Sequence, residues 1–170
     1  MRRPGTPGRG NTDDVLARLR PWLVVPLVTL VVVTLIARLI GVLLPDDGIG
    51  WVDAVRGGLA AMFATSATAH FGRGRVALIR LVPLGLPNPP RIVTVTGLLE
   101  FAGVVGLIVP ESARLAAVCL AALLVAIFPA NVQSSRRPGA SGRSPATPLW
   151  FRAVVQVVLI AACGLVAVAG

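Results

Sequence analysis

The sequence predicts an all-α integral membrane protein with five transmembrane helices, and three observations carry this prediction. Of the 170 residues, 55% are hydrophobic and only 14% are charged. The apolar residues are gathered into runs of about 20, which is the length that a helix needs to cross a bilayer. The arginines lie mostly between these runs. A soluble domain would intersperse its apolar and polar residues, so we expect a multi-pass protein of the cell membrane with the lipid bilayer as its partner.

The first part of the chain predicts a tail followed by an anchor. Residues 1–20 are basic and rich in Gly and Pro, which is typical of a disordered tail, here on the cytoplasmic side. Residues 21–44 form an apolar run that is too long for a signal peptide and lacks a small-residue cleavage site before Pro45. We therefore expect a retained N-terminal transmembrane anchor.

Residues 51–170 predict a domain of four further spans. The first of these is rich in small residues at three- and four-residue spacing, which lets helices approach closely in lipid. Residues 72–91 contain VALIRLVPLGL, which is too short to cross and too apolar for a plain loop, so an interfacial or re-entrant segment is expected. Residues 131–149 are expected to be a linker. The four spans are predicted at about 51–71, 92–109, 112–130 and 149–170.

The distribution of arginine predicts the orientation. The N-terminal tail has five arginines, residues 72–91 have four and residues 131–149 have three. The other two connections have none and carry Asp46, Asp47 and Glu111 instead. Because basic residues stay on the cytoplasmic side, the N-terminus is expected inside and the C-terminus outside.

Four polar side chains are then predicted to gather in the cytoplasmic half of the membrane. They are Glu100, His70, Gln156 and Arg152, each placed there by its distance from the cytoplasmic end of its helix. A carboxyl group at such a depth costs about 2.5 kcal/mol or more, unless it is paired, hydrated or protonated. We therefore regard these four residues as a candidate intramembrane polar pocket that binds a cofactor.

A purely structural interpretation stays open for each of them. Glu100 could be a carboxyl that holds the bundle together through Arg152 or Arg56, and His70 could be an interfacial residue at a helix end. Gln156 could serve only as a hydrogen bond between helices, as amides commonly do in lipid.

Several other chemistries have no support in the sequence. His70 is the only histidine, which excludes a bis-histidine haem and a multi-histidine metal site within one chain. Cys119 and Cys163 are isolated in apolar runs and form no CxxC or zinc spacing. The net charge of +9 does not lie along one amphipathic face, so nucleic-acid binding is not expected.

Residues 51–170 carry a set of motifs in a consistent order. They are AHF at 69–71, LVPLGLPNPPRIV at 81–93, TGLLEFAGVVGLIVP at 96–110, SARLAAVCLAALLVAIFPANV at 112–132 and FRAVVQVVLI at 151–160. This set resembles the DoxX-like family of small integral membrane proteins. Glu100 and the tetrapeptide FPAN fall where the family pattern places glutamate and Phe-Pro-Ala-Asn. The first span, residues 21–44, lies outside the resemblance.

The resemblance implies a DoxX-like four-helix bundle and a connection to redox chemistry. The family takes its name from a subunit of a quinone-linked oxidase system, so it implies a quinone as a possible cofactor and membrane redox proteins as possible partners. The chain itself shows no haem ligand pair and no flavin fingerprint, and we expect it not to be catalytic on its own. Three functions stay open: a quinone-contacting or accessory redox subunit, a structural or assembly protein, and a small-solute or proton permease using Glu100. An oligomer is compatible with each.

Overall fold

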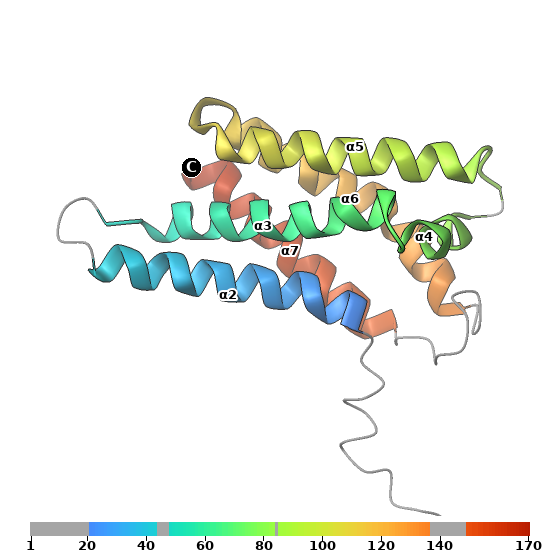
Figure 1. The fold of residues 1–170 in the computed structure, drawn as a ribbon, viewed down its shortest axis with the longest axis horizontal. Coiled ribbons are helices and arrows are strands. Elements are labelled where there is room, and N and C mark those ends of the chain that lie inside the picture. The colour runs from blue at the N-terminus through green and yellow to red at the C-terminus, as the bar shows by residue number, and fades with distance from the viewer. Residues whose placement is uncertain (1–20, 44–47, 84, 137–148) are drawn as a thin grey trace, which may run out of the picture.

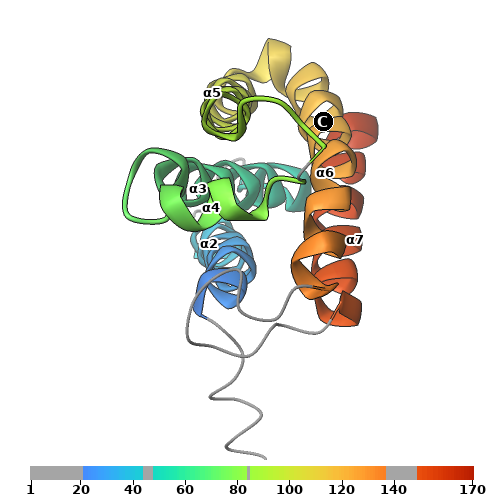
Figure 2. The same cartoon turned by 90° about the vertical axis from the view of Figure 1, so that its right-hand side faces the viewer.

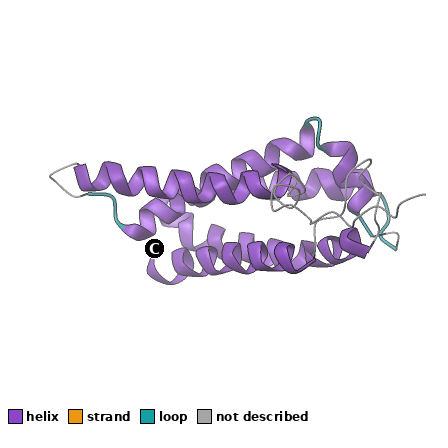
Figure 3. Ribbon diagram, turned by 90° about the horizontal axis from the view of Figure 1, so that it is seen from below, coloured by secondary structure: helices purple, strands orange, loops and turns teal. Residues whose placement is uncertain are grey.

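A computed structural model describes residues 21–43, 48–83, 85–136 and 149–170, and in these residues all regular structure is helical (Figures 1 and 3). This confirms the all-α prediction. The predicted tail, residues 1–20, and most of the predicted linker lie outside the described residues. The helices are α2 (Pro21–Leu43), α3 (Trp51–Phe71), α4 (Arg75–Leu81), α5 (Pro89–Ile108), the 3-10 turn η1 (Pro110–Ser112), α6 (Ala113–Arg136) and α7 (Leu149–Ala169).

Helix α3 is at the centre of the bundle. Figure 2 shows α2, α3 and α5 one above the other, with α6 and α7 running side by side next to them. Helix α3 contacts α2, α5 and α7, and α6 contacts α5 and α7. The core is shared by α2, α3, α5, α6 and α7, and the Leu59, Met62 and Phe63 side chains of α3 are fully buried in it. This position agrees with the small residues of α3, which let its neighbours approach.

Four helical segments are long and apolar enough to cross a membrane. Helix α3 is not among them because its small and polar residues lower its mean hydropathy. Large apolar side chains such as Leu39 (60% exposed) and Val157 (65% exposed) lie on the outer surface of the bundle. Such an apolar exterior is typical of a surface that meets lipid rather than water. The four segments are Val25–Leu43, Pro89–Ile108, Pro110–Ala130 and Leu149–Ala169.

The boundaries of two helices differ from the prediction. Helix α5 begins at Pro89, three residues earlier than expected, since Pro is well suited to the first turn of a helix. Helix α6 continues past Pro129 to Arg136, so a linker beginning at residue 131 was wrong over its first six residues. No Gly or Pro follows Pro129 until Pro138, and a proline disfavours helical backbone in the residue before it.

The ends of the helices fall into two groups. The α3–α5 connection, which contains α4, lies at the same end of the bundle as the end of α6 and the start of α7 (Figures 1 and 2). Helix α4 contacts α3, α5 and α6 there. The α5–α6 turn and the C-terminus lie at the opposite end (Figure 1). The candidate site is close to the α4 end.

Candidate functional site

Three of the four predicted site residues are buried. In the described part of the chain, the buried polar or charged side chains are His70, Glu100 and Gln156, with 7%, 3% and 6% of their surface exposed. Arg152 is half-buried on α7, one turn before Gln156. Burial of a polar group is costly unless a partner compensates it, so the contacts of each residue decide its role.

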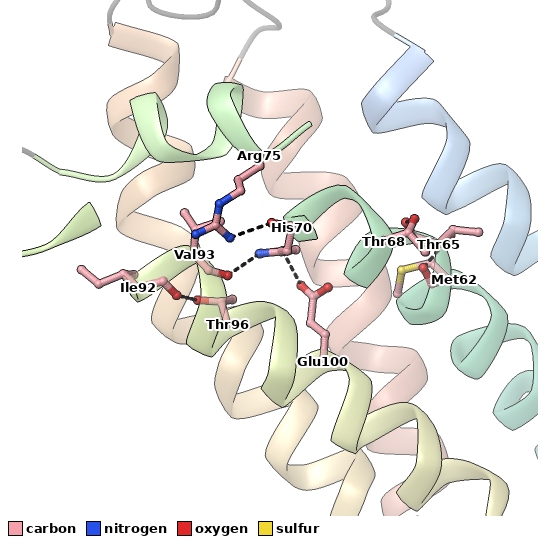
Figure 4. Close-up of polar contacts among 9 residues, drawn as sticks. All are labelled: Met62, Thr65, Thr68, His70, Arg75, Ile92, Val93, Thr96 and Glu100. Atoms are coloured by element: carbon pink, nitrogen blue, oxygen red, sulfur yellow. Dashed lines mark hydrogen bonds and ion pairs between the residues drawn. The ribbon is translucent and has the colours of Figure 1, made fainter. Parts of the chain in front are cut away.

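His70 and Glu100 form a buried pair between two helices. The His70 Nε2 atom lies 3.5 Å from the Glu100 Oε1 atom, and the two side chains are only 9% and 4% exposed. His70 is in the last turn of α3, and Glu100 is near the middle of α5 (Figure 4). The structure therefore brings together two of the four predicted site residues, Glu100 and His70.

A backbone carbonyl holds the other nitrogen of the imidazole. His70 Nδ1 lies 2.8 Å from the carbonyl oxygen of Val93, one helical turn after the start of α5. Because a carbonyl oxygen can only accept a hydrogen bond, Nδ1 is the donor in this contact. The ring is thus fixed at both nitrogens by α5, although it belongs to α3.

Gly97 provides the space in which His70 packs. A Cβ atom at position 97 would lie 2.6 Å from His70 Cβ and 2.9 Å from His70 Cγ. Contacts of that length do not occur between real side chains, so any larger residue would push the imidazole away from α5. The glycine of the TGLLEF motif therefore has a steric role one turn from the glutamate.

Arg75 ties the same two helices together from α4, and the sequence analysis did not identify it as a site residue. Its Nη1 atom donates to the carbonyl of His70 at 3.1 Å. Its Nη2 atom donates to the carbonyl of Pro90 at 3.2 Å and to Thr94 Oγ1 at 2.9 Å (Figure 4 shows Arg75 above His70). In the sequence, Arg75 contributes only to the arginine distribution that predicts the orientation, because no spacing pattern connects it to residues 70, 90 and 94.

One oxygen of Glu100 lacks a hydrogen-bond partner among the described residues. In the part of the chain that the structure describes, Glu100 Oε2 is buried and accepts no hydrogen bond. Thr96, one turn earlier on α5, donates its hydroxyl to the carbonyl of Ile92 at 2.7 Å and so does not serve the carboxyl group. An unsatisfied buried acceptor costs about 1–3 kcal/mol. Glu100 Oε2 is therefore an atom at which a hydrogen-bond donor could bind.

Gln156 contacts a different helix. Its Nε2 atom donates to the carbonyl of Leu124, which joins α7 to α6. This contact supports the interpretation of Gln156 as a hydrogen bond between helices. Among the predicted site residues, the structure thus shows two polar contacts, the His70–Glu100 pair between α3 and α5 and the Gln156 amide contact between α7 and α6.

The described ion pairs give Arg56 and Glu100 partners other than each other. Arg56 pairs with Asp53 at 3.1 Å, one turn apart near the start of α3 and at the opposite end of that helix from His70. Among the described residues, the ion pair of Glu100 is with His70 and not with Arg152.

The described cysteines and acidic residues do not gather into a metal site. Cys119 is exposed, Cys163 is buried and both are free thiols. Within residues 21–43, 48–83, 85–136 and 149–170, no group of three or more His, Cys, Asp or Glu side chains could hold a metal ion.

The His70–Glu100 pair lies within the part of the chain that matches a family model. The family described as Domain of unknown function (DUF8561) matches residues 59–167. The chain belongs to this family. The DUF8561 region begins within α3 and contains both His70 and Glu100, whereas α2 precedes it. No curated protein and no solved structure matches the chain.

Proposed function

We propose that this DUF8561 protein is a quinone-contacting or accessory subunit of a membrane redox system, and that His70 and Glu100 form its polar contact with the quinone. One observation carries the proposal: Glu100 Oε2 is buried beside His70 and has no partner among the described residues. A quinol hydroxyl would supply the missing donor. The resemblance of the motifs around both residues to DoxX-like proteins supports a quinone as the ligand.

The proposal includes five spans with the N-terminus inside. Helix α3 has 21 residues, which corresponds to about 30 Å and so to the thickness of the hydrocarbon core. Its contacts with α2, α5 and α7 and the burial of Ala54, Gly58 and Ala67 support a span despite its lower hydropathy, while Gly57, Thr65 and Thr68 lie on its exposed side. Arg73, Arg80 and Arg91 near the α4 end support a cytoplasmic position for that end.

Accessibility labelling tests this orientation. In a variant without Cys119 and Cys163, a membrane-impermeant thiol reagent added outside intact cells should label Glu111→Cys and not Arg73→Cys. Labelling of Arg73→Cys from outside would overturn the orientation.

Mass spectrometry of the protein purified in mild detergent tests the ligand. A lipophilic quinone should copurify with the wild-type protein and with Glu111→Gln, in which an exposed carboxyl group far from the site is changed. Glu100→Leu should lose the quinone because no acceptor is left at position 100. Glu100→Gln should keep the fold and abolish any proton-linked activity. Absence of a quinone from the wild-type protein, or equal recovery from Glu100→Leu, would contradict the proposal.

A second candidate is a structural or assembly role, and one observation favours it. The contacts of His70, Glu100 and Arg75 join α3, α4 and α5, which would suffice to explain why the polar groups are present. In that case Glu100→Leu should keep both its fold and its partner proteins. Partner proteins recovered by gentle purification and identified by mass spectrometry distinguish the two candidates.

A further inference from the structure

We infer that His70 and Glu100 hold one proton between Nε2 and Oε1, and that Glu100 Oε2 accepts a hydrogen bond from a neutral, lipophilic ligand that bears a hydroxyl group. The inference rests on the proposed function in that it takes the pair to be a ligand site. It adds the location of the proton and the atom that the ligand meets.

The tautomer of His70 follows from its backbone contact. The Val93 carbonyl, 2.8 Å from Nδ1, has no hydrogen to give, so the proton of that contact belongs to Nδ1. A neutral imidazole carries only one N–H, and in this tautomer Nε2 is left with a lone pair directed at Glu100.

A proton between Nε2 and Oε1 follows from their distance. If neither atom carried hydrogen, two acceptors would face each other at 3.5 Å in a buried site. One proton on either atom converts the contact into a hydrogen bond or an ion pair. Both arrangements, imidazole with carboxylic acid or imidazolium with carboxylate, have no net charge, and burial favours a neutral pair.

Arg75 opposes the uptake of a second proton. Its guanidinium group donates to the His70 carbonyl at 3.1 Å and so places a positive charge next to the imidazole. A doubly protonated pair would add a second positive charge at the same end of α3. The site is therefore suited to a single proton that moves between two atoms.

The free oxygen then defines the class of ligand. A cation bound at Oε2 would add positive charge to a neutral pair near Arg75, so a neutral donor fits better. The neighbours of Glu100 along α5 include Leu98, Leu99 and Phe101, which are all more than half exposed on the apolar exterior. Glu100 itself faces the interior beside α3, so a ligand that reaches its Oε2 atom from the apolar exterior must pass apolar side chains and would itself be apolar except for its donor group.

Nitrogen NMR of the protein in nanodiscs tests the position of the proton. Since His70 is the only histidine, isotope-labelled histidine gives one assigned ring. We expect a protonated Nδ1 in the wild-type protein, in Glu100→Gln and in the control Glu111→Gln. The Nε2 signal should differ from that of a bare ring nitrogen in the wild type and the control, and should move to the bare value in Glu100→Leu, which has no hydrogen-bond donor at position 100. A bare Nδ1, or an Nε2 signal that is unchanged in Glu100→Leu, would overturn the inference.

Butylphenol and its methyl ether test the acceptor, because they differ only in the hydroxyl donor. In titrations that follow the His70 signals, the phenol should bind about tenfold or more tightly than the ether, the effect of one hydrogen bond to a charged or strongly polar group. Glu100→Gln, with an amide oxygen, should keep this preference, and Glu100→Leu should lose it. Equal binding of both probes to the wild-type protein would overturn the assignment of Oε2. If a quinone still copurified in that case, the proposed function would stand without this inference.

Discussion

Two helix contacts made by α3 are alike in packing and differ in chemistry. At the α2–α3 contact, a Cβ atom on Gly58 would lie 2.2 Å from Thr34 Oγ1. At the α3–α5 contact, a Cβ atom on Gly97 would lie 2.6 Å from His70 Cβ. In each case a glycine lets a polar residue of the neighbouring helix come close. Only the second contact contains a buried ion pair.

The polar groups at the two contacts also differ in how they are satisfied. On α2, Arg38 donates to the carbonyl of Ile49 and lies 4.8 Å from the ring of Trp51, at the exposed end of the helix. On α4, Arg75 binds three oxygen atoms from α3 and α5 beside the His70–Glu100 pair. Helix α2 precedes the DUF8561 region, and the α3–α5 contact lies within it. Close packing alone therefore explains the α2–α3 contact. The α3–α5 contact also contains a buried His–Glu pair and an arginine that binds both helices.

The largest expected effect comes from removing one member of the pair. His70→Leu leaves the Glu100 carboxyl group buried without its partner, and the free energy of unfolding should fall by about 3–5 kcal/mol. The double variant His70→Leu/Glu100→Leu should recover most of that loss, because an apolar pair can replace a buried ion pair at little cost. Equilibrium unfolding by dodecyl sulfate in mild detergent measures both. A double variant no more stable than the single one would contradict this account.

The next effect concerns the two glycine contacts. Gly97→Ala and Gly58→Ala should each destabilise the protein by about 1–3 kcal/mol through overpacking. Gly57→Ala is the matched control, because a Cβ atom at Gly57 meets nothing within 4 Å. That change should be neutral or stabilising by up to about 1 kcal/mol, as expected for Ala in a helix.

Only one of these alanine variants should disturb the imidazole. Gly97→Ala should alter the NMR signals of His70, whereas Gly58→Ala should leave them unchanged despite a similar loss of stability. Equal changes in both would mean that the two contacts are coupled and that the comparison fails.

A smaller effect is expected from the arginine on α4. Arg75→Gln removes the charged donor from the ends of α3 and α5 and should cost about 1.5 kcal/mol or more. Arg80→Gln, on the same short helix but exposed, should change stability by less than about 0.5 kcal/mol. Thermal unfolding of both variants in detergent gives the comparison, and equal midpoints would exclude a specific role for Arg75.

The smallest effect is expected on α2. Thr34→Val replaces a hydroxyl group that is buried without a hydrogen-bond partner in the described residues. Since no bond is lost, stability should change by less than about 1 kcal/mol, in the stabilising direction. A clear destabilisation in the same unfolding assay would show that Thr34 has a polar partner after all, and the α2–α3 contact would then resemble the α3–α5 contact.

Most helix positions could be predicted, because the length and apolarity of a segment are properties of the local sequence. Runs of about 20 apolar residues gave helices close to their expected positions. The extension of α6 to Arg136 differs from the predicted linker because a polar composition does not by itself end a helix. The described helix continues to Arg136, and the first residue type that disfavours a helix after Pro129 in the sequence is Pro138.

The sequence predicted which residues belong to the candidate site, but it did not predict which of them contact one another. Glu100 and His70 stood out because an ionisable residue in an apolar run is rare. The rotation of each helix about its axis decides which polar side chains meet. It brings His70 to Glu100 and brings Gln156 to the Leu124 carbonyl on α6. That rotation follows from contacts such as those of Gly97 and Arg75, which join residues far apart in sequence and leave no periodic signal.

The start of α5 has a consequence for any engineered change upstream of the glutamate. Pro89 and Pro90 carry no N–H, and the amides of Arg91 and Ile92 both donate to the carbonyl of Asn88, whose backbone is left-handed with φ 52°. The first turn of α5 therefore has no free amide. These contacts fix the rotation of α5 about its own axis at that turn. Inserting a single residue between this turn and Glu100 would rotate the carboxylate by about 100°, and so would direct it away from the imidazole while leaving the composition of the span almost unchanged.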